Sequence, residues 1–184
     1  MSLAQSLAAQ LGPIEQLAYV PSSFEASLDY WTNTMGVGPF FMIEHMPLVD
    51  TKYRGEPTVI DSSVALAYWG NMQIELVRQH NDGRSAYKDW LDAGRDDLHH
   101  VMCRIDDIEA ARAQCEGVGG VAVTEGRLLG SGHFIYFDMG GPGPMLEIVW
   151  MEPAFQRLFA FMREAARDWN GQEPLRAVPP EADW

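Results

Sequence analysis

The sequence is poor in cysteine and in basic residues, and it has no long apolar run. Its two cysteines, Cys103 and Cys115, are too few for the disulfide framework of a small secreted protein, so a reducing compartment is favoured. Lys and Arg number 13 against 26 Asp and Glu, and the net charge of −13 disfavours nucleic acid and anionic membranes as partners. Residues 1–11 contain no Lys or Arg and no long apolar stretch, so they predict neither a signal peptide nor a membrane span. We therefore expect a cytoplasmic protein.

Apolar residues are plentiful, at 47% of 184 positions, which is enough for the core of a single domain over residues 1–184. Residues 2–11 place leucines four apart and predict a short helix. Residues 153–169 predict a longer helix, because Pro153 suits the first helical position and the apolar residues after it form one stripe. The final segment, 172–184, is rich in proline and acidic residues, so we expect a loose tail.

The middle of the chain contains a weak internal repeat. The segment QLAYVPSSFEAS, which starts at Gln16, matches HVMCRIDDIEAA, which starts 84 residues later at His100. Both segments read as a strand, a short turn and the start of a helix, and the helices are expected to begin near Ser23 and Asp107, which are good N-caps. Each copy then ends in a similar strand, IELV in the first and LEIV in the second. We therefore expect module one at 14–79, a polar linker at 80–97, module two at 98–151 and the C-terminal helix at 153–169.

Strand periodicity places four polar residues at equivalent positions of the two copies. Alternate residues of a strand share a face, so Glu75 and Glu147 lie opposite the apolar face of each closing strand. Gln16 and His100 begin the two first strands. One imidazole nitrogen and three oxygen donors suit a divalent ion with open positions, such as Zn²⁺, Mn²⁺, Ni²⁺ or Co²⁺. Two carboxylates that face one cavity also repel unless a cation, a proton or a basic group lies between them.

Two segments carry a family resemblance. Residues 96–120 (DDLHHVMCRIDDIEAARAQCEGVGG) and 133–150 (HFIYFDMGGPGPMLEIVW) resemble the start and the closing hairpin of the second module in glyoxalase I and methylmalonyl-CoA epimerase. These enzymes belong to the vicinal oxygen chelate superfamily (glyoxalase/bleomycin resistance/dioxygenase). The resemblance spans about residues 14–151 and implies an α+β fold of two βαβββ modules, whose curled mixed sheets surround a central cavity. It implies four metal ligands, the set found in the zinc form of glyoxalase I: Gln16, Glu75, His100 and Glu147.

The sequence also departs from these relatives. Glyoxalase I carries glutathione-binding arginines near its first and third ligands, but Val20 and Asp96 stand at those places here, with Arg95 adjacent. Glutathione recognition is therefore not expected. The epimerases take a second acid from the middle of module one, for which Glu56 and Asp61 are the candidates.

Three further residues are candidates for substrate binding. Arg104 shares a face with His100, and it either neutralises an anionic group of the substrate or pairs with a neighbouring carboxylate. Met102 and Met145 either line an adaptable apolar pocket or fill the core. His99 faces the other side of its strand and is expected to be structural.

The resemblance and the site together predict an isomerase, epimerase or lyase that transfers a proton next to a carbonyl of a small apolar or acyl substrate. Glu147 or Glu75 would move the proton. One alternative is a metal-free module that binds a small molecule, as resistance proteins of this fold do. Another is an Fe(II) ring-cleaving dioxygenase, which needs His where Gln16 stands. We also expect a homodimer, because the terminal segments 2–11 and 153–169 are apolar enough to pack on a partner.

Overall fold

The computed structural model describes residues 6–128 and 132–180, so residues 2–5 of the predicted N-terminal helix lie outside the described residues. The helices are α1 (Leu7–Leu11), α2 (Phe24–Asp29) with its π-helical continuation η2 (Tyr30–Thr34), α3 (Ala86–Asp92), α4 (Ile108–Gly117) and α5 (Pro153–Arg167). The strands are β1 (Gln16–Tyr19), β2 (Phe40–Ile43), β3 (Leu48–Tyr53), β4 (Glu56–Pro57), β5 (Ser62–Trp69), β6 (Met72–Gln79), β7 (Leu98–Arg104), β8 (Val121–Leu128), β9 (Gly132–Asp138), β10 (Met145–Met151) and β11 (Leu175–Ala177).

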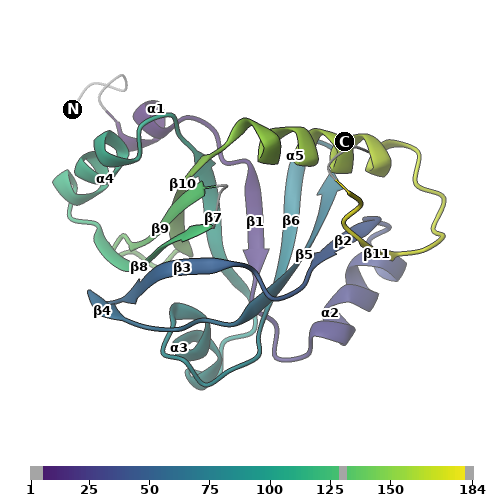
Figure 1. The fold of residues 1–184 in the computed structure, drawn as a ribbon, viewed down its shortest axis with the longest axis horizontal. Helices are drawn as coiled ribbons and strands as arrows, with labels where there is room; N and C mark the ends of the chain where they lie inside the picture. The colour runs from purple at the N-terminus through teal and green to yellow at the C-terminus, as the bar shows by residue number, and fades with distance from the viewer. Residues whose placement is uncertain (1–5, 129–131, 181–184) are drawn as a thin grey trace.

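The described strands form one curled, mixed sheet in the order β11-β2-β5-β6-β1-β7-β10-β9-β8-β3-β4 (Figure 1). The first unit runs β1-α2-β2-β5-β6 and the second runs β7-α4-β8-β9-β10. In each unit the first strand pairs in parallel with the last strand, β1 with β6 and β7 with β10. The predicted fold class, α+β with two βαβββ modules in a curled mixed sheet, is confirmed.

An approximate two-fold axis relates the two units. Strands β1 and β7 pair antiparallel, and Leu17 lies opposite Val101. These two residues are 84 positions apart in the chain, the same offset as the sequence repeat. The axis therefore passes through this pair, and the two first strands lie side by side at the centre of the sheet.

Helices α2 and α4 begin at side-chain caps on equivalent turns. The Ser23 side chain accepts a hydrogen bond from the backbone N–H of Ala26, and the Asp107 side chain accepts from the N–H groups of Glu109 and Ala110. Both helices pack on the outer face of the sheet, where α2 covers apolar residues of β5 and β6 and α4 covers those of β9 and β10. The other, concave face is left for the cavity.

Helix α5 packs on the concave face of the sheet. Its apolar stripe places Leu158, Phe159 and Met162 in the same buried cluster as Leu66 of β5 and Val149 of β10. The helix ends at Arg167, two residues before the end predicted from the sequence. No helix in residues 6–128 and 132–180 is long and apolar enough to cross a membrane.

Three of the described strands, β3, β4 and β11, are not predicted by the sequence. Strand β3 leaves the first unit and pairs antiparallel with β8 of the second unit, so the β3–β4 hairpin passes across the central strands (Figure 1). Strand β11 pairs in parallel with β2, and Phe40 donates its backbone N–H to the carbonyl oxygen of Pro174. The expectation of a loose tail is therefore wrong for Leu175–Ala177, because this segment satisfies backbone groups of a strand that would otherwise be exposed at the sheet edge.

Candidate functional site

The four candidate ligands lie on four adjacent strands at the centre of the sheet. Glu75 is on β6, Gln16 on β1, His100 on β7 and Glu147 on β10. Ala18 lies beside both Glu75 and His100, and Met102 is the partner of both Gln16 and Glu147. Residues paired directly across neighbouring strands point to the same face, so all four side chains face the concave side.

The imidazole of His100 lies between the two carboxylates. Its Nε2 atom is 3.3 Å from Oε2 of Glu75 and 3.4 Å from Oε2 of Glu147, without the geometry of a hydrogen bond. The His100 side chain is fully buried, and the exposed fractions of the two Glu side chains are 12% and 11%. The three ligand atoms do not all lie within 4.8 Å of one another, so an ion would draw the carboxylates inward.

Gln16 lines the same cavity as the two carboxylates. Its amide Nε2 donates to Oε1 of Gln73 over 2.7 Å, and the amide of Gln73 donates in turn to the hydroxyl of Tyr68 over 3.0 Å. This chain of hydrogen bonds fixes the amide orientation of Gln16. Its oxygen, Oε1, is buried and has no hydrogen-bond partner among the described residues.

The charges at this centre compensate one another only in part. Burial lowers the pKa of His100, but Glu147 and Glu75 outweigh burial and raise it to about 9. Burial raises the pKa of Glu147, the charge of Glu75 adds to this, and His100 opposes it. One imidazolium thus faces two buried carboxylates. A divalent cation that takes the place of the Nε2 proton would balance the two carboxylates and bind the free atoms Gln16 Oε1 and His100 Nε2, so the donor set of one nitrogen and three oxygens fits such an ion.

His99 holds His100 in place, a role that the sequence analysis missed. The Nδ1 atoms of the two histidines are 2.9 Å apart. Burial and the charge of His100 keep the pKa of His99 well below its usual value, so His99 is neutral. His100 therefore donates its Nδ1–H to His99, which turns Nε2 toward the carboxylates. The His99 ring packs edge-on against Trp90 and beside Tyr87, both from α3.

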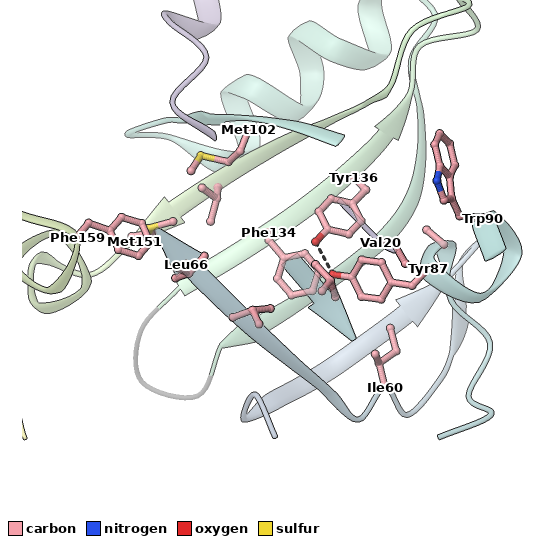
Figure 2. Packing of buried hydrophobic residues seen from close by; sticks show 14 of the residues in the cluster. Val20, Ile60, Leu66, Tyr87, Trp90, Met102, Phe134, Tyr136, Met151 and Phe159 are labelled. Carbon is pink, nitrogen blue, oxygen red and sulfur yellow. Dashed lines mark hydrogen bonds between the residues drawn. The ribbon is translucent and has the colours of Figure 1, made fainter. Parts of the chain in front are cut away.

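Two tyrosines line the cavity together with Glu75 and Glu147. The hydroxyl oxygens of Tyr87 and Tyr136 are 2.6 Å apart, and the dashed line in Figure 2 marks the hydrogen bond between them. Burial raises the pKa of both tyrosines well above 10, so they remain hydroxyls. Tyr136 is the direct partner of Glu147 in the β9–β10 hairpin, and hairpin register applied to the sequence would have found it. No sequence signal locates Tyr87, because it comes from the linker.

Apart from these polar groups and Ser62, the cavity is lined by apolar residues. The space between the lining residues measures about 590 Å³, including the part that is open to solvent. Among the described residues that line it, none is basic, and Glu75 and Glu147 are the only acids. The apolar lining comes from the strands, from the segment between β2 and β3, and from helix α5, and it includes Met46, Leu66, Met102, Phe134, Phe155 and Phe159.

Of the three candidates for substrate binding, one lines the cavity and two do not. Met102 lines the cavity, whereas Met145 lies outside it, in a separate depression beside Trp90 and Arg95. Arg104 does not line the cavity, because its guanidinium donates to Oε1 of Glu15 over 3.0 Å at the surface. Substrate contacts by Arg104 and Met145 are therefore not supported.

Neither candidate for the second acid reaches the cavity. Glu56 is exposed on the edge strand β4. Asp61 accepts from the imidazole of His45 on the surface. The acids available inside the cavity are those on the closing strands of the two units.

Comparisons with known proteins agree with this architecture. The family model of the Glyoxalase/Bleomycin resistance protein/Dioxygenase superfamily matches residues 15–137. A hypothetical protein from Bacillus halodurans superposes with a TM-score of 0.58 at 11% identity, covering 76% of this chain and 94% of its own. Methylmalonyl-CoA epimerase of Streptomyces coelicolor, in complex with 2-nitronate-propionyl-CoA, has a TM-score of 0.56 at 16% identity, with coverages of 77% and 95%.

A second epimerase, from Mycobacterium tuberculosis, has a TM-score of 0.52 at 17% identity, and the match covers 78% of this chain and 91% of the epimerase. No curated protein shows significant sequence similarity to the chain. At these identities the solved structures establish a shared fold, and the family model establishes membership. The chain belongs to the glyoxalase/bleomycin resistance protein/dioxygenase superfamily, the group of vicinal oxygen chelate proteins.

Proposed function

We propose that this protein is a metal-dependent isomerase, epimerase or lyase that transfers a proton at the carbon next to a carbonyl. The observation that carries the proposal is the position of His100 Nε2 between two buried carboxylates, at 3.3 and 3.4 Å, in a cavity that also presents the unpaired oxygen of Gln16. Buried acids of this kind are costly unless they serve a ligand or a reaction.

Four residues would hold the ion: Gln16, Glu75, His100 and Glu147. The donor set suits Zn²⁺, Ni²⁺, Co²⁺ or Mn²⁺. A bound divalent ion would polarise the carbonyl of a substrate and lower the pKa of the adjacent C–H group. Outside the ligand set, His99 fixes the ring of His100 and Gln73 fixes the amide of Gln16.

Glu147 or Glu75, one of them released from the ion, would carry the proton. Burial raises the pKa of Glu147, which makes its carboxylate a stronger base. The two carboxylates approach the centre from the two units of the fold, which is the arrangement needed to remove a proton from one face of a carbon and return it to the other. One hydroxyl of the Tyr87–Tyr136 pair donates to the other, and the remaining hydroxyl proton can be donated to an oxygen on which negative charge develops.

The cavity lining favours a small and largely apolar substrate. No basic side chain lines the described part of the cavity, so an anionic group of the substrate would have no protein cation to pair with there. An acyl compound is a candidate because the chain shares its fold with an epimerase crystallised with 2-nitronate-propionyl-CoA. The part of the substrate that enters the cavity is then uncharged and consists of a carbonyl group with an aliphatic or aromatic substituent.

The proposal is tested by metal binding and by hydrogen exchange. Zn²⁺, Mn²⁺, Ni²⁺ or Co²⁺ at about one hundred times its Kd should add roughly 3 kcal/mol, which raises the melting temperature by about 5–10 °C. His100→Ala should remove most of this shift. Glu147→Gln should retain most of the metal but abolish solvent-deuterium exchange into a panel of small apolar ketones and acyl thioesters, followed by NMR.

The control is Glu15→Gln, which alters a carboxylate that pairs with Arg104 outside the cavity and should leave both properties unchanged. If none of the four ions raises the melting temperature and protein purified without chelator carries no metal, the enzyme proposal fails. A module that binds a small apolar molecule would then remain.

A further inference from the structure

A second group of metal-ligating side chains lies on the surface, away from the cavity. Glu44 and His45 directly follow β2, and His80 directly follows β6. One possible ligand atom from each of the three residues lies within 4.8 Å of the other two. The neighbouring β5 residues Ser62 and Val64 line the central cavity, so Ser63 between them points to the opposite face of the sheet and toward this cluster.

A buried hydroxyl organises the cluster. Ser63, which is fully buried, donates from Oγ to Oε2 of Glu44 over 2.6 Å and lies 2.7 Å from Nε2 of His80. The backbone N–H of His45 also donates to Ser63 Oγ, over 3.0 Å. Because the hydroxyl proton goes to Glu44, His80 donates through Nε2–H, and its Nδ1 carries the free lone pair.

His45 is oriented in the way that metal-binding histidines usually are. Its Nδ1 lies 2.7 Å from Oδ1 of Asp61, so the ring donates through Nδ1–H and leaves Nε2 free. The backbone of His45 has a φ of 49°, in the left-handed region that non-glycine residues adopt infrequently. Strained backbone of this kind persists where surrounding contacts fix it, and it is often found at ligand sites.

The ring geometry also suits a shared ion. The centroids of the His45 and His80 rings are 4.8 Å apart, with 37° between the ring planes. Two imidazoles bound to one tetrahedral ion place their centroids about 5 Å apart, and their ligand atoms about 3.3 Å apart. The two ring centroids already lie close to this separation, and the exposed position of the side chains lets their ligand atoms adjust on binding.

We propose that Glu44, His45 and His80 bind a second divalent transition-metal ion, of the Zn²⁺ type, independently of the central site. The ligands are a carboxylate oxygen of Glu44, Nε2 of His45 and Nδ1 of His80, with water in the remaining position. The ion ties the end of β2 to the end of β6 across β5. The same β2–β3 connection carries Met46 and leads into Leu48 of β3, and both residues line the cavity, so the ion also fixes one wall of the cavity.

The test counts Zn²⁺ ions by calorimetric titration. The double variant His45→Ala/His80→Ala should bind one equivalent fewer than the unaltered protein, while His133→Ala, a matched change at another histidine, should bind the full number. Both altered side chains are exposed, so the double variant should fold normally. Asp61→Asn should weaken the same equivalent about tenfold, because it removes the partner that orients His45.

Electron paramagnetic resonance of bound Cu²⁺ gives a second measurement. His100→Ala protein, which lacks the central imidazole, should still bind one Cu²⁺ with two nitrogen ligands. Equal numbers of Zn²⁺ ions in the unaltered protein and the double variant would overturn the proposal, as would the lack of any two-nitrogen Cu²⁺ signal. The double variant also isolates the central ion, so the thermal-shift test of the proposed function can be repeated in it without interference.

Discussion

His99 and His100 are consecutive residues of β7, so their side chains start on opposite faces of the sheet. Their Nδ1 atoms nevertheless lie 2.9 Å apart and share a hydrogen bond. A neutral His99 accepts from His100, and this fixes which nitrogen of His100 faces the carboxylates. Contacts that fix the tautomer of a ligand histidine usually contribute strongly to metal affinity. His99 is therefore a positioning residue for the proposed centre.

His99→Phe should separate positioning from packing. Phenylalanine keeps an aromatic ring against Trp90 and Tyr87 but cannot accept the hydrogen bond from His100. We expect the affinity for Zn²⁺ at the central site to fall by about 10- to 100-fold, with the fold retained. Competition with a chromogenic chelator measures the affinity, and circular dichroism checks the fold. His133→Phe, a matched change on β9, should leave the affinity unaltered, and equal affinities of all three proteins would contradict the positioning role.

At the residue scale, strand periodicity is enough to predict that Glu75, His100 and Glu147 lie on one face, because side chains alternate between the two faces of any strand. His99 was expected to be structural because the same rule sends its side chain to the other face. Two ring nitrogens on neighbouring residues can nevertheless meet around the edge of the strand, and a rule based on faces alone does not describe this.

Among the elements, the linker between the two units contributes more than its polar sequence indicated. Its helix α3 begins at the cap Ser85 and buries Tyr87 and Trp90, whose rings pack against His99. Its end is fastened to the turn before α2, where Asp96 accepts from the hydroxyl of Ser22 over 2.5 Å and from the N–H of the same residue over 2.8 Å. At the start of the linker, the Ser85 hydroxyl also donates to Oε1 of Gln79, so the linker is tied to the fold at both ends.

The contact between Ser22 and Asp96 predicts a pH-dependent contribution to stability. The two hydrogen bonds from Ser22 hold the pKa of Asp96 below its usual value. A lowered carboxyl pKa stabilises the fold above the ordinary value of about 4, and this contribution disappears as the pH falls through the lowered value. Because Asp96 is exposed, the contribution should stay below about 1 kcal/mol.

Asp96→Asn should therefore lower the melting temperature by about 1–3 °C at pH 7 and by less near pH 3. Scanning calorimetry at both values provides the measurement. Asp97→Asn removes the same charge from the next residue and serves as the control. A difference of equal size at both pH values would show that the carboxylate charge plays no part.

The elements that the sequence did not reveal are those held by distant partners. Strand β3 has no regular alternation of burial, and it forms because β8 of the other unit offers it an edge. Strand β11 has only three residues and depends on β2 in the same way. Helices α2, α4 and α5 could be predicted because their caps, proline and apolar stripes are local in the sequence.

For the whole molecule, the repeat offset of 84 residues was the most informative feature of the sequence, because it coincides with the pairing of Leu17 and Val101 across the two-fold axis. The closure of the cavity by α5 was not predictable. The apolar stripe of α5 was expected to face a partner chain, but Leu158, Phe159 and Met162 are buried against the protein's own sheet. The module boundaries at 14–79 and 98–151 stay predictions.

A homodimer also stays a prediction, but the apolar side chains that would form its interface are not those of the α5 stripe. Trp69 and Val121 are 57% and 63% exposed, and they are candidates for contacts with a partner chain. Light scattering at micromolar concentration should give a mass of twice 20.6 kDa. A single species of 20.6 kDa over the whole concentration range would refute the dimer.

The ligand candidates are divided between the two units, with Gln16 and Glu75 in the first and His100 and Glu147 in the second. During synthesis on a ribosome, the first unit emerges before any of the second, and it then carries only an amide and a carboxylate. The imidazole follows with β7 and the last carboxylate with β10, so a newly made chain cannot complete its centre until the two halves have docked along β1 and β7. An ion at the centre would therefore bind only after both units have folded and docked. A chain whose synthesis stops before β10 would be released without the ion.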